Sequence, residues 1–122
     1  MNQFQRTELL IGKEGLKKLQ AAHVIVFGIG GVGGYVVEAL ARSGVGELTL
    51  VDSDNVSLTN LNRQIIATHE TIGQSKVQVM AKRIASINPA CKVHTKQIFF
   101  LPDNQDQFDF SLYDYVVDAV DT

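Results

Sequence analysis

Residues 28–33 read GIGGVG, and this glycine loop constrains the fold of the chain more than any other feature. The run before it, residues 23–27, is short, apolar and rich in β-branched residues, which is typical of a buried parallel strand. The run after it, residues 31–43, has the character of a helix and ends at Gly44, where a C-cap glycine belongs. A strand, a G-x-G-x-x-G loop and a helix in this order predict a phosphate-binding turn.

Each glycine of the loop has an expected task. Gly28 permits the tight turn after the strand, Gly30 lets the backbone approach a phosphate, and Gly33 lets the helix pack closely on the strand. Asp52 lies 19 residues beyond Gly33, at the end of a second apolar run, where a carboxylate can accept hydrogen bonds from ribose hydroxyls. These residues predict a nucleotide site, whose default occupant would be NAD.

The rest of the chain alternates between predicted strands and helices. Residues 1–22 are expected to form a helical extension that is broken at Gly12 and Gly15. Strands are predicted at residues 23–27, 47–51, 92–99 and 115–120, a short helix at 102–108, and an irregular polar stretch with one helical turn at 53–74. Apolar stripes predict the buried faces of two longer helices, Val32, Val36, Ala39 and Leu40 in the first and Val77, Met80, Ile84 and Ile87 in the second.

This order of elements predicts an α/β fold of the Rossmann-like type. We expect a mostly parallel sheet of strand order 3-2-1-4 with helices on both faces, truncated after its fourth strand. A chain of 122 residues has room for one domain at most. Because a covered parallel sheet normally continues beyond this point, residues 1–122 are expected to be the N-terminal, nucleotide-binding part of a longer protein.

The composition restricts the classes of binding partner and the cellular compartment that we expect for the protein. The formal net charge of −2 argues against a dedicated nucleic-acid binder, although 11 basic and 7 acidic residues precede residue 97. No apolar run is long enough to cross a membrane, and residues 1–10 do not resemble an export signal. The single cysteine, Cys91, fits a reducing compartment, so a cytoplasmic location is expected.

The polar stretch after Asp52 favours a triphosphate over NAD. Arg63 can grip phosphate oxygens bidentately, and Lys76 can act as a point charge near the carboxyl edge of the sheet. Such cations stabilise the charge that develops when the α-phosphate of ATP is attacked, whereas the pyrophosphate of NAD is held mainly by backbone amides. Further candidate nucleotide ligands in this stretch are Asp54, Asn60 and Gln64.

Two carboxylates at the end of the fourth predicted strand are candidates for a magnesium site. Asp118 and Asp121 follow the apolar run at 115–117, and Asp121 is the expected ligand of a phosphate-bound Mg²⁺. Magnesium favours one or two carboxylates together with phosphate oxygens, and these are the ligands expected at this edge of the sheet.

Taken together, these motifs resemble the ThiF/MoeB/HesA family, which is related to ubiquitin-activating enzymes. The resemblance is carried by GIGGVG, ARSGVGELTLVDSDNVSLTNLNRQ, TIGQSKVQVMAKRIASINP and VVDAVDT, and it extends from about residue 4 to residue 122. Members of this family use ATP and Mg²⁺ to adenylylate a carboxylate and release pyrophosphate. Asp52-Ser53-Asp54 departs from the family pattern, because Ser53 stands where relatives usually carry a bulky apolar residue.

The resemblance implies a role for each motif residue. Gly31 would lie against the nucleotide, Asp52 would bind the ribose, and Asp121 would bind Mg²⁺. Arg6 would reach into the active site of a partner subunit, which implies a homodimer. The residues implied to hold the triphosphate and stabilise charge at phosphorus are Asn60, Arg63 and Lys76.

Within the family, the chain is most similar to the tRNA threonylcarbamoyladenosine dehydratases. The segments that carry this similarity are RTELLIGKEGLKKL, TNLNRQ and the final Asp-Thr. The implied substrate is the threonyl carboxylate of threonylcarbamoyladenosine in tRNA, which would cyclise with net loss of water. The alternative within the family is activation of a ubiquitin-like sulfur-carrier protein. The alternative outside it is an NAD-dependent oxidoreductase or an inactive nucleotide-binding module.

The histidines and the cysteine are not predicted to carry chemistry. His23, His69 and His94 share no metal-ligand spacing, so no metal site is expected from them. Cys91 is expected to be a structural thiol, because no activating group stands beside it in the sequence.

Overall fold

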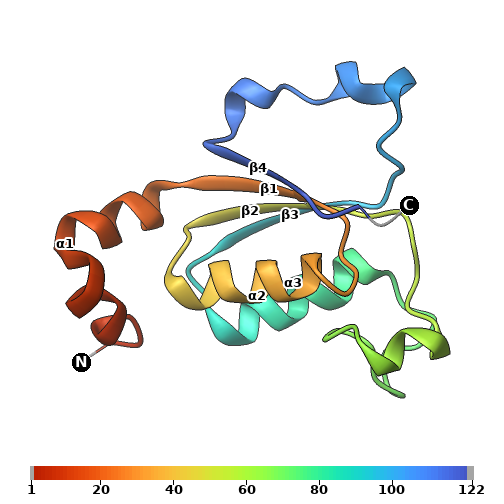
Figure 1. Cartoon of the computed structure of the whole chain (residues 1–122), viewed down its shortest axis with the longest axis horizontal. Coiled ribbons are helices and arrows are strands. Elements are labelled where there is room, and N and C mark those ends of the chain that lie inside the picture. The colour runs from red at the N-terminus through yellow and green to blue at the C-terminus, as the bar shows by residue number, and fades with distance from the viewer. Residues whose placement is uncertain (1, 121–122) are drawn as a thin grey trace.

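The computed structural model describes residues 2–120 and shows one α/β unit (Figure 1). Four strands form a single sheet, and the long N-terminal helix α1 extends from the end of the sheet at which β1 begins. The helices are α1 (Gln5–Ala21), α2 (Gly33–Ser43) and α3 (Lys76–Ile87), with 3-10 helices η1 (Leu58–Asn62), η2 (Pro102–Gln107) and η3 (Phe110–Leu112). The strands are β1 (His23–Phe27), β2 (Glu47–Val51), β3 (Lys92–Lys96) and β4 (Tyr115–Asp118).

The sheet has the predicted Rossmann-like topology. Its strand order is β3-β2-β1-β4, and every neighbouring pair is parallel. The order of the elements along the chain sets this topology, because each parallel pair needs a crossover connection and such crossovers are right-handed. All four carboxyl ends therefore lie at one edge of the sheet, where a ligand of such a fold is bound.

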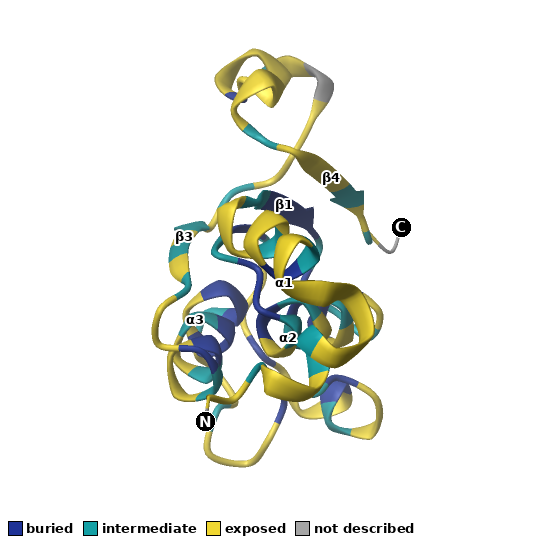
Figure 2. Ribbon diagram, turned by 90° about the vertical axis from the view of Figure 1, so that its left-hand side faces the viewer, coloured by how far each residue is buried: buried dark blue, intermediate teal, exposed yellow. Residues whose placement is uncertain are grey.

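The two faces of the sheet are covered by different kinds of helix. On one face α2 and α3 pack against Val24 and Val26 of β1 and against Leu48 and Leu50 of β2, and these residues form the main core. On the other face the β3–β4 crossover, with η2 and η3, brings Phe108 against Phe27. Figure 2 shows that the buried residues are concentrated in the α2/α3 layer and the central strands, whereas the crossover is largely exposed.

The buried face of α2 differs from the predicted stripe. Val32 is exposed, and the buried positions are Gly33, Gly34, Val37 and Ala41. A Cβ on Gly33 would lie 1.7 Å from the carbonyl oxygen of Gly28, so this glycine marks the side of α2 that touches the strand. The apolar stripe could not identify that side, because apolar residues occur around most of the helix. In α3 the predicted stripe is confirmed.

One predicted helix break, at Gly15, and two predicted strand ends differ from the structure. The chain of α1 departs from helical geometry at Gly12, where φ is 78°, but it continues through Gly15. Strand β3 ends at Lys96 and β4 at Asp118, both earlier than predicted, because pairing with their neighbours stops there. The predicted C-cap at Gly44 is confirmed by its φ of 107°.

Cys91 has the character of a structural thiol. Burial raises its pKa to about 11, which leaves almost no thiolate near neutral pH. Within residues 2–120, no helix combines the length and the apolar character needed to cross a membrane.

Candidate nucleotide-binding site

The glycine loop lies where β1 meets the end of β4. Gly28 has a φ of 93°, and a Cβ there would lie 2.6 Å from the carbonyl oxygen of Ala119. Its amide donates to the carbonyl of Val51, the last residue of β2, at 2.8 Å. The close contact of the loop with its neighbours requires glycine at positions 28 and 33, as the motif predicted. At Gly31 a Cβ would come no closer than 3.7 Å to another residue's atoms.

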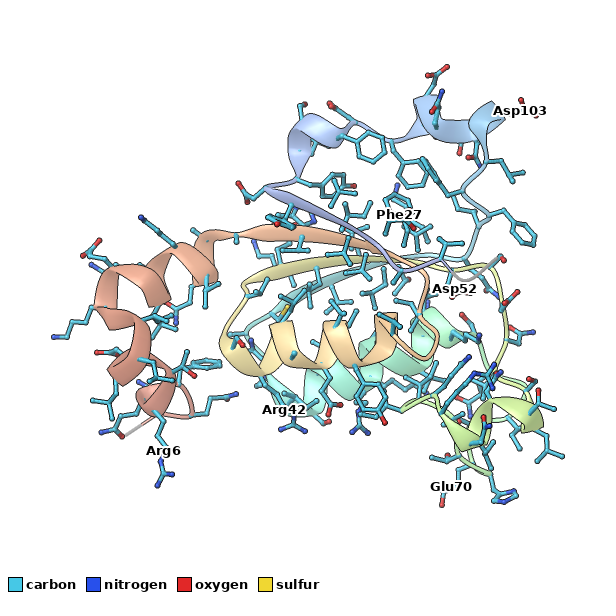
Figure 3. All side chains as sticks on the ribbon, in the orientation of Figure 1. Arg6, Phe27, Arg42, Asp52, Glu70 and Asp103 are labelled. Atoms are coloured by element: carbon cyan, nitrogen blue, oxygen red, sulfur yellow. The ribbon has the colours of Figure 1, made fainter. Side chains whose placement is uncertain are left out.

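Asp52 is held facing the loop by two backbone amides. Its Oδ2 accepts the N–H of Ile29 at 2.7 Å, and its Oδ1 accepts the N–H of Asp54 at 2.8 Å. Each carboxylate oxygen keeps a second lone pair for a further donor. The carboxylate is half-buried at the carboxyl edge of the sheet, beside the loop predicted to hold phosphate (Figure 3). This placement suits it to accept ribose hydroxyls.

The segment between β2 and α3 folds back over the loop. Asn60 of η1 is buried, and its Oδ1 accepts the N–H of Ser57 at 2.8 Å. The backbone carbonyl of Asn60 accepts the N–H of Gln64 at 2.9 Å, which brings the Gln64 side chain beside Gly30. A Cβ on Gly30 would lie 3.5 Å from Nε2 of Gln64. The capping hydrogen bonds of Asn60 thus position Gln64 against the glycine loop.

Gln64 presents a buried acceptor without a partner. Among residues 2–120 its Oε1 is the single fully buried side-chain oxygen or nitrogen that makes no hydrogen bond. An unpaired buried carbonyl costs about 1–3 kcal/mol, so such a group normally has a partner that the chain does not provide. A nucleotide offers donors of this kind in its ribose hydroxyls and its base amine.

Two cations flank this region. The aliphatic stem of Arg63 lies beside Gly31, and its Nη1 donates to the carbonyl of Thr59 at 3.0 Å and to Oδ1 of Asn62 at 2.9 Å. Arg63 as a whole is exposed. Thr59 and Asn62, which orient Arg63, were not predicted from the sequence, although they lie close to Arg63 in the chain.

Lys76 is the buried cation of the site. It is the first residue of α3, its side chain is 7% exposed, and its Nζ lies 3.9 Å from Oδ2 of Asp54. The backbone amide of Lys76 donates to the carbonyl of Asp54 at 3.1 Å. Asp54, two residues after Asp52, therefore fixes the start of α3. Asp54 is exposed and beyond hydrogen-bonding distance of Nζ, which leaves the ammonium able to bind a phosphate.

The acidic end of β4 lies next to the loop. Asp118 pairs in register with Phe27, the residue before Gly28, and its Oδ1 accepts the N–H of Val120 at 3.2 Å. Its carboxylate is exposed at the same edge of the sheet as Asp52. Asp121, the predicted magnesium ligand, lies outside the described residues.

Arg6 is the one described candidate that lies away from this edge. It is exposed on α1, at the opposite end of the molecule from Asp52 (Figure 3). One copy of the chain therefore does not bring Arg6 to its own site. The other described candidates cluster around the glycine loop, or are linked to it through Asp52 and Asp54.

Comparison with known proteins places this geometry in a family. The ThiF family model matches residues 4–122. The chain is 53% identical, over its whole length, to the tRNA threonylcarbamoyladenosine dehydratase of Bacillus subtilis, of which it covers 48%. It is 35% identical, over 99% of its length, to the sulfur carrier protein adenylyltransferase of Thermus thermophilus, of which it covers 45%.

A solved structure matches equally well. The crystal structure of the Escherichia coli tRNA N6-threonylcarbamoyladenosine dehydratase, TcdA, in complex with ATP superposes with a TM-score of 0.95 at 47% identity. The match covers 98% of this chain and 49% of that one. The chain thus spans about half the length of the relatives it matches. With the family model matched over nearly all of its residues, the chain belongs to the ThiF family.

Proposed function

We propose that the protein uses ATP and Mg²⁺ to activate a carboxylate by adenylylation. The observation that carries this proposal is Lys76 at the carboxyl edge of the sheet, whose side chain is only 7% exposed and whose Nζ makes a 3.9 Å ion pair with the exposed Asp54 but no hydrogen bond within residues 2–120. A largely buried lysine is stabilised by a close anion, and a phosphate can approach its Nζ more closely than Asp54 does. The residues present fit ATP, because the glycine loop is open at Gly31 and Gln64 offers an unpaired acceptor.

The residues of the site divide the work between binding and charge stabilisation. Asp52 accepts hydrogen bonds from the ribose, and the glycine loop and the N-terminus of α2 hold phosphate oxygens. A substrate carboxylate oxygen attacks the α-phosphorus, the bond to the bridging oxygen breaks, and pyrophosphate leaves with that electron pair. Arg63, Lys76 and Asn60 stabilise the charge that develops on the phosphates. Asp121 and Asp118 are the residues that would hold Mg²⁺, which would neutralise part of the same charge.

We propose the threonyl carboxylate of threonylcarbamoyladenosine in tRNA as the substrate. The support is the name shared by the relatives at 53% and 47% identity. Adenylylation makes this carboxylate an electrophile, and the neighbouring ureido group closes a ring as AMP leaves. The nucleoside loses one water overall, because one oxygen of its carboxylate leaves as part of AMP. The second candidate is the C-terminus of a ubiquitin-like sulfur-carrier protein, which the relative at 35% identity favours.

We also propose that the protein acts as a homodimer in the cytoplasm. Arg6 is exposed and distant from Asp52 in its own chain, which is what an arginine that serves a partner's site requires.

The two substrates are distinguished by their products. We expect the protein, supplied with ATP, Mg²⁺ and threonylcarbamoyladenosine-modified tRNA, to form AMP and a nucleoside that has lost one water, measured by mass spectrometry of digested tRNA. A ubiquitin-like carrier with a free C-terminus should yield no adenylate under the same conditions. Adenylation of the carrier without change in the tRNA would favour the second candidate instead.

A further inference from the structure

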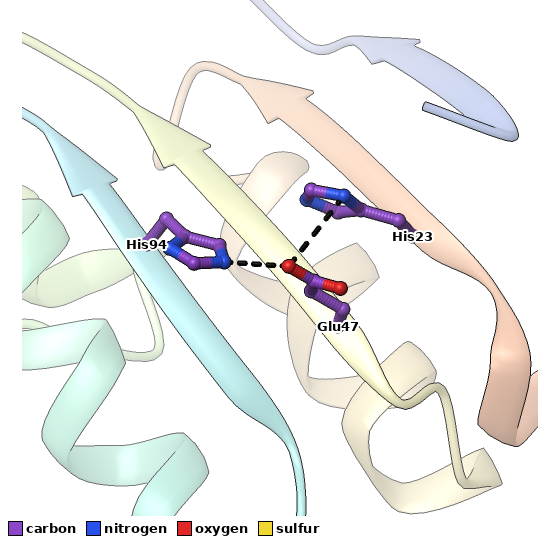
Figure 4. Close-up of side chains that lie close together, drawn as sticks. All are labelled: His23, Glu47 and His94. Carbon is purple, nitrogen blue, oxygen red and sulfur yellow. Dashed lines mark hydrogen bonds and ion pairs between the residues drawn. The ribbon is translucent and has the colours of Figure 1, made fainter. Parts of the chain in front are cut away.

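The structure brings together three potential metal ligands that are remote in the sequence. His23 begins β1, Glu47 begins β2, and His94 lies in the middle of β3. The register pairs His23 with Glu47 and His94 with Thr49, so these side chains emerge from one face of three adjacent strands (Figure 4). The cluster lies toward the amino ends of the strands, away from the nucleotide site.

The ligand atoms converge on one point. Nε2 of His94 lies 2.6 Å from Oε2 of Glu47, and Nδ1 of His23 lies 3.7 Å from the same oxygen. One ligand atom from each residue can be chosen so that all lie within 4.8 Å of one another. Ligands of a tetrahedral zinc ion with bonds of ~2.0–2.1 Å are about 3.4 Å apart, so small side-chain rotations suffice.

The ring of His23 is oriented by a buried hydroxyl. Its Nε2 lies 2.8 Å from Oγ1 of Thr49, and Thr49 is 1% exposed. When Nε2–H donates to this hydroxyl, Nδ1 carries the lone pair and faces the carboxylate of Glu47. A histidine that binds a metal through one nitrogen commonly donates its other N–H in this way, and the partner fixes ring and tautomer.

The charge of this cluster and its exposure to solvent suit a metal cation. Glu47 places a carboxylate oxygen against the imidazole rings of both His94 and His23. The exposed fraction of the side chains rises from 18% at His23 to 33% at Glu47 and 51% at His94, so the cluster is open to solvent on one side. Lys92, the register partner of Glu47, is an exposed opposing charge.

We propose that His23, Glu47 and His94 bind a zinc ion, with water completing its coordination. Two imidazoles and a carboxylate are a ligand set that zinc takes in proteins, and Thr49 serves as the positioning residue of His23. This proposal differs from the expectation based on histidine spacing, which detects ligands close in sequence but not ligands that a parallel register brings together. The alternative is a structural ion pair between His94 and Glu47.

Zinc titration of the purified, chelator-treated protein tests the proposal. Calorimetry with Zn²⁺ alone should show one saturable site, and Co²⁺ should give the visible absorption of tetrahedral coordination. Glu47→Gln and His94→Gln are expected to weaken Zn²⁺ binding by at least ~100-fold, and Thr49→Val by about 10-fold. Lys92→Gln should tighten binding, because it removes an opposing charge. His69→Gln, which changes an exposed histidine outside the cluster, is the matched control and should bind Zn²⁺ like the unchanged protein.

Circular dichroism of each metal-free variant separates loss of ligand from loss of fold. His94 is half exposed, so His94→Gln should keep the thermal midpoint of the metal-free protein. Absence of a saturable Zn²⁺ site, or equal weakening by His69→Gln and by His94→Gln, would overturn the proposal and leave the ion pair.

Discussion

Replacing Lys76 by methionine is expected to weaken ATP binding by about 10- to 100-fold, while AMP binding stays nearly unchanged. The charge-assisted contact of an ammonium with phosphate is worth about 1.5–3 kcal/mol, and AMP carries only one phosphate of the triphosphate that Lys76 is proposed to hold. Methionine keeps the apolar stem that Lys76 buries. Arg63→Ala should act in the same direction. Calorimetric titration with each nucleotide measures the difference.

The matched control is Lys82→Met, which removes an exposed lysine from the same helix. Its ATP and AMP affinities should equal those of the unchanged protein. A Lys76→Met variant that lost affinity for both nucleotides equally would mean that Lys76 supports the fold of the site rather than the triphosphate. A Lys76→Met variant that kept its affinity for ATP would show that Lys76 does not bind the nucleotide.

Gly33→Ala is expected to lower the free energy of unfolding by about 3 kcal/mol or more. The added methyl carbon would lie 1.7 Å from the carbonyl oxygen of Gly28, and backbone must move to accept it. Because the same backbone forms the phosphate-binding turn, nucleotide affinity should fall as well. Urea denaturation followed by circular dichroism measures the stability.

Gly31→Ala provides the comparison within the same loop. A Cβ at Gly31 would make only ordinary contacts, 3.7 Å from the stem of Arg63, so stability should change by no more than about 0.5 kcal/mol. Equal destabilisation by Gly31→Ala and by Gly33→Ala would show that the loop accepts a methyl group at neither position. The tight contact of α2 with β1 would then not be the cause.

The fold was predictable because the sequence patterns of individual strands, turns and helices agreed with the order of elements expected for a Rossmann-like sheet. The glycine loop marked the turn between β1 and α2, and the stripe in α3 marked its buried face. The buried face of α2 was not predictable from hydrophobicity. That face is selected by Gly33, which carries no hydrophobic signal but is the only residue type that fits against Gly28.

The site was predictable in residue type and less so in geometry. Asp52 was expected beside the glycine loop, and its hydrogen bond with Ile29 puts it there. No pattern in the sequence indicates that Oε1 of Gln64 is buried without a partner, or that His23 and His94 meet across β2. Both depend on strand register and loop packing, which couple residues far apart in the chain.

The exchange of labelled pyrophosphate into ATP tests the central claim most directly. With Mg²⁺ and modified tRNA present, we expect label to enter ATP, because adenylylation of the carboxylate is reversible. Omission of the tRNA should stop the exchange, and Arg63→Ala, Lys76→Met or Asp121→Ala should reduce it by about 10²- to 10³-fold. Exchange that these variants leave untouched would contradict the assigned site. Absence of exchange in a protein that binds NAD more tightly than ATP would contradict the account as a whole.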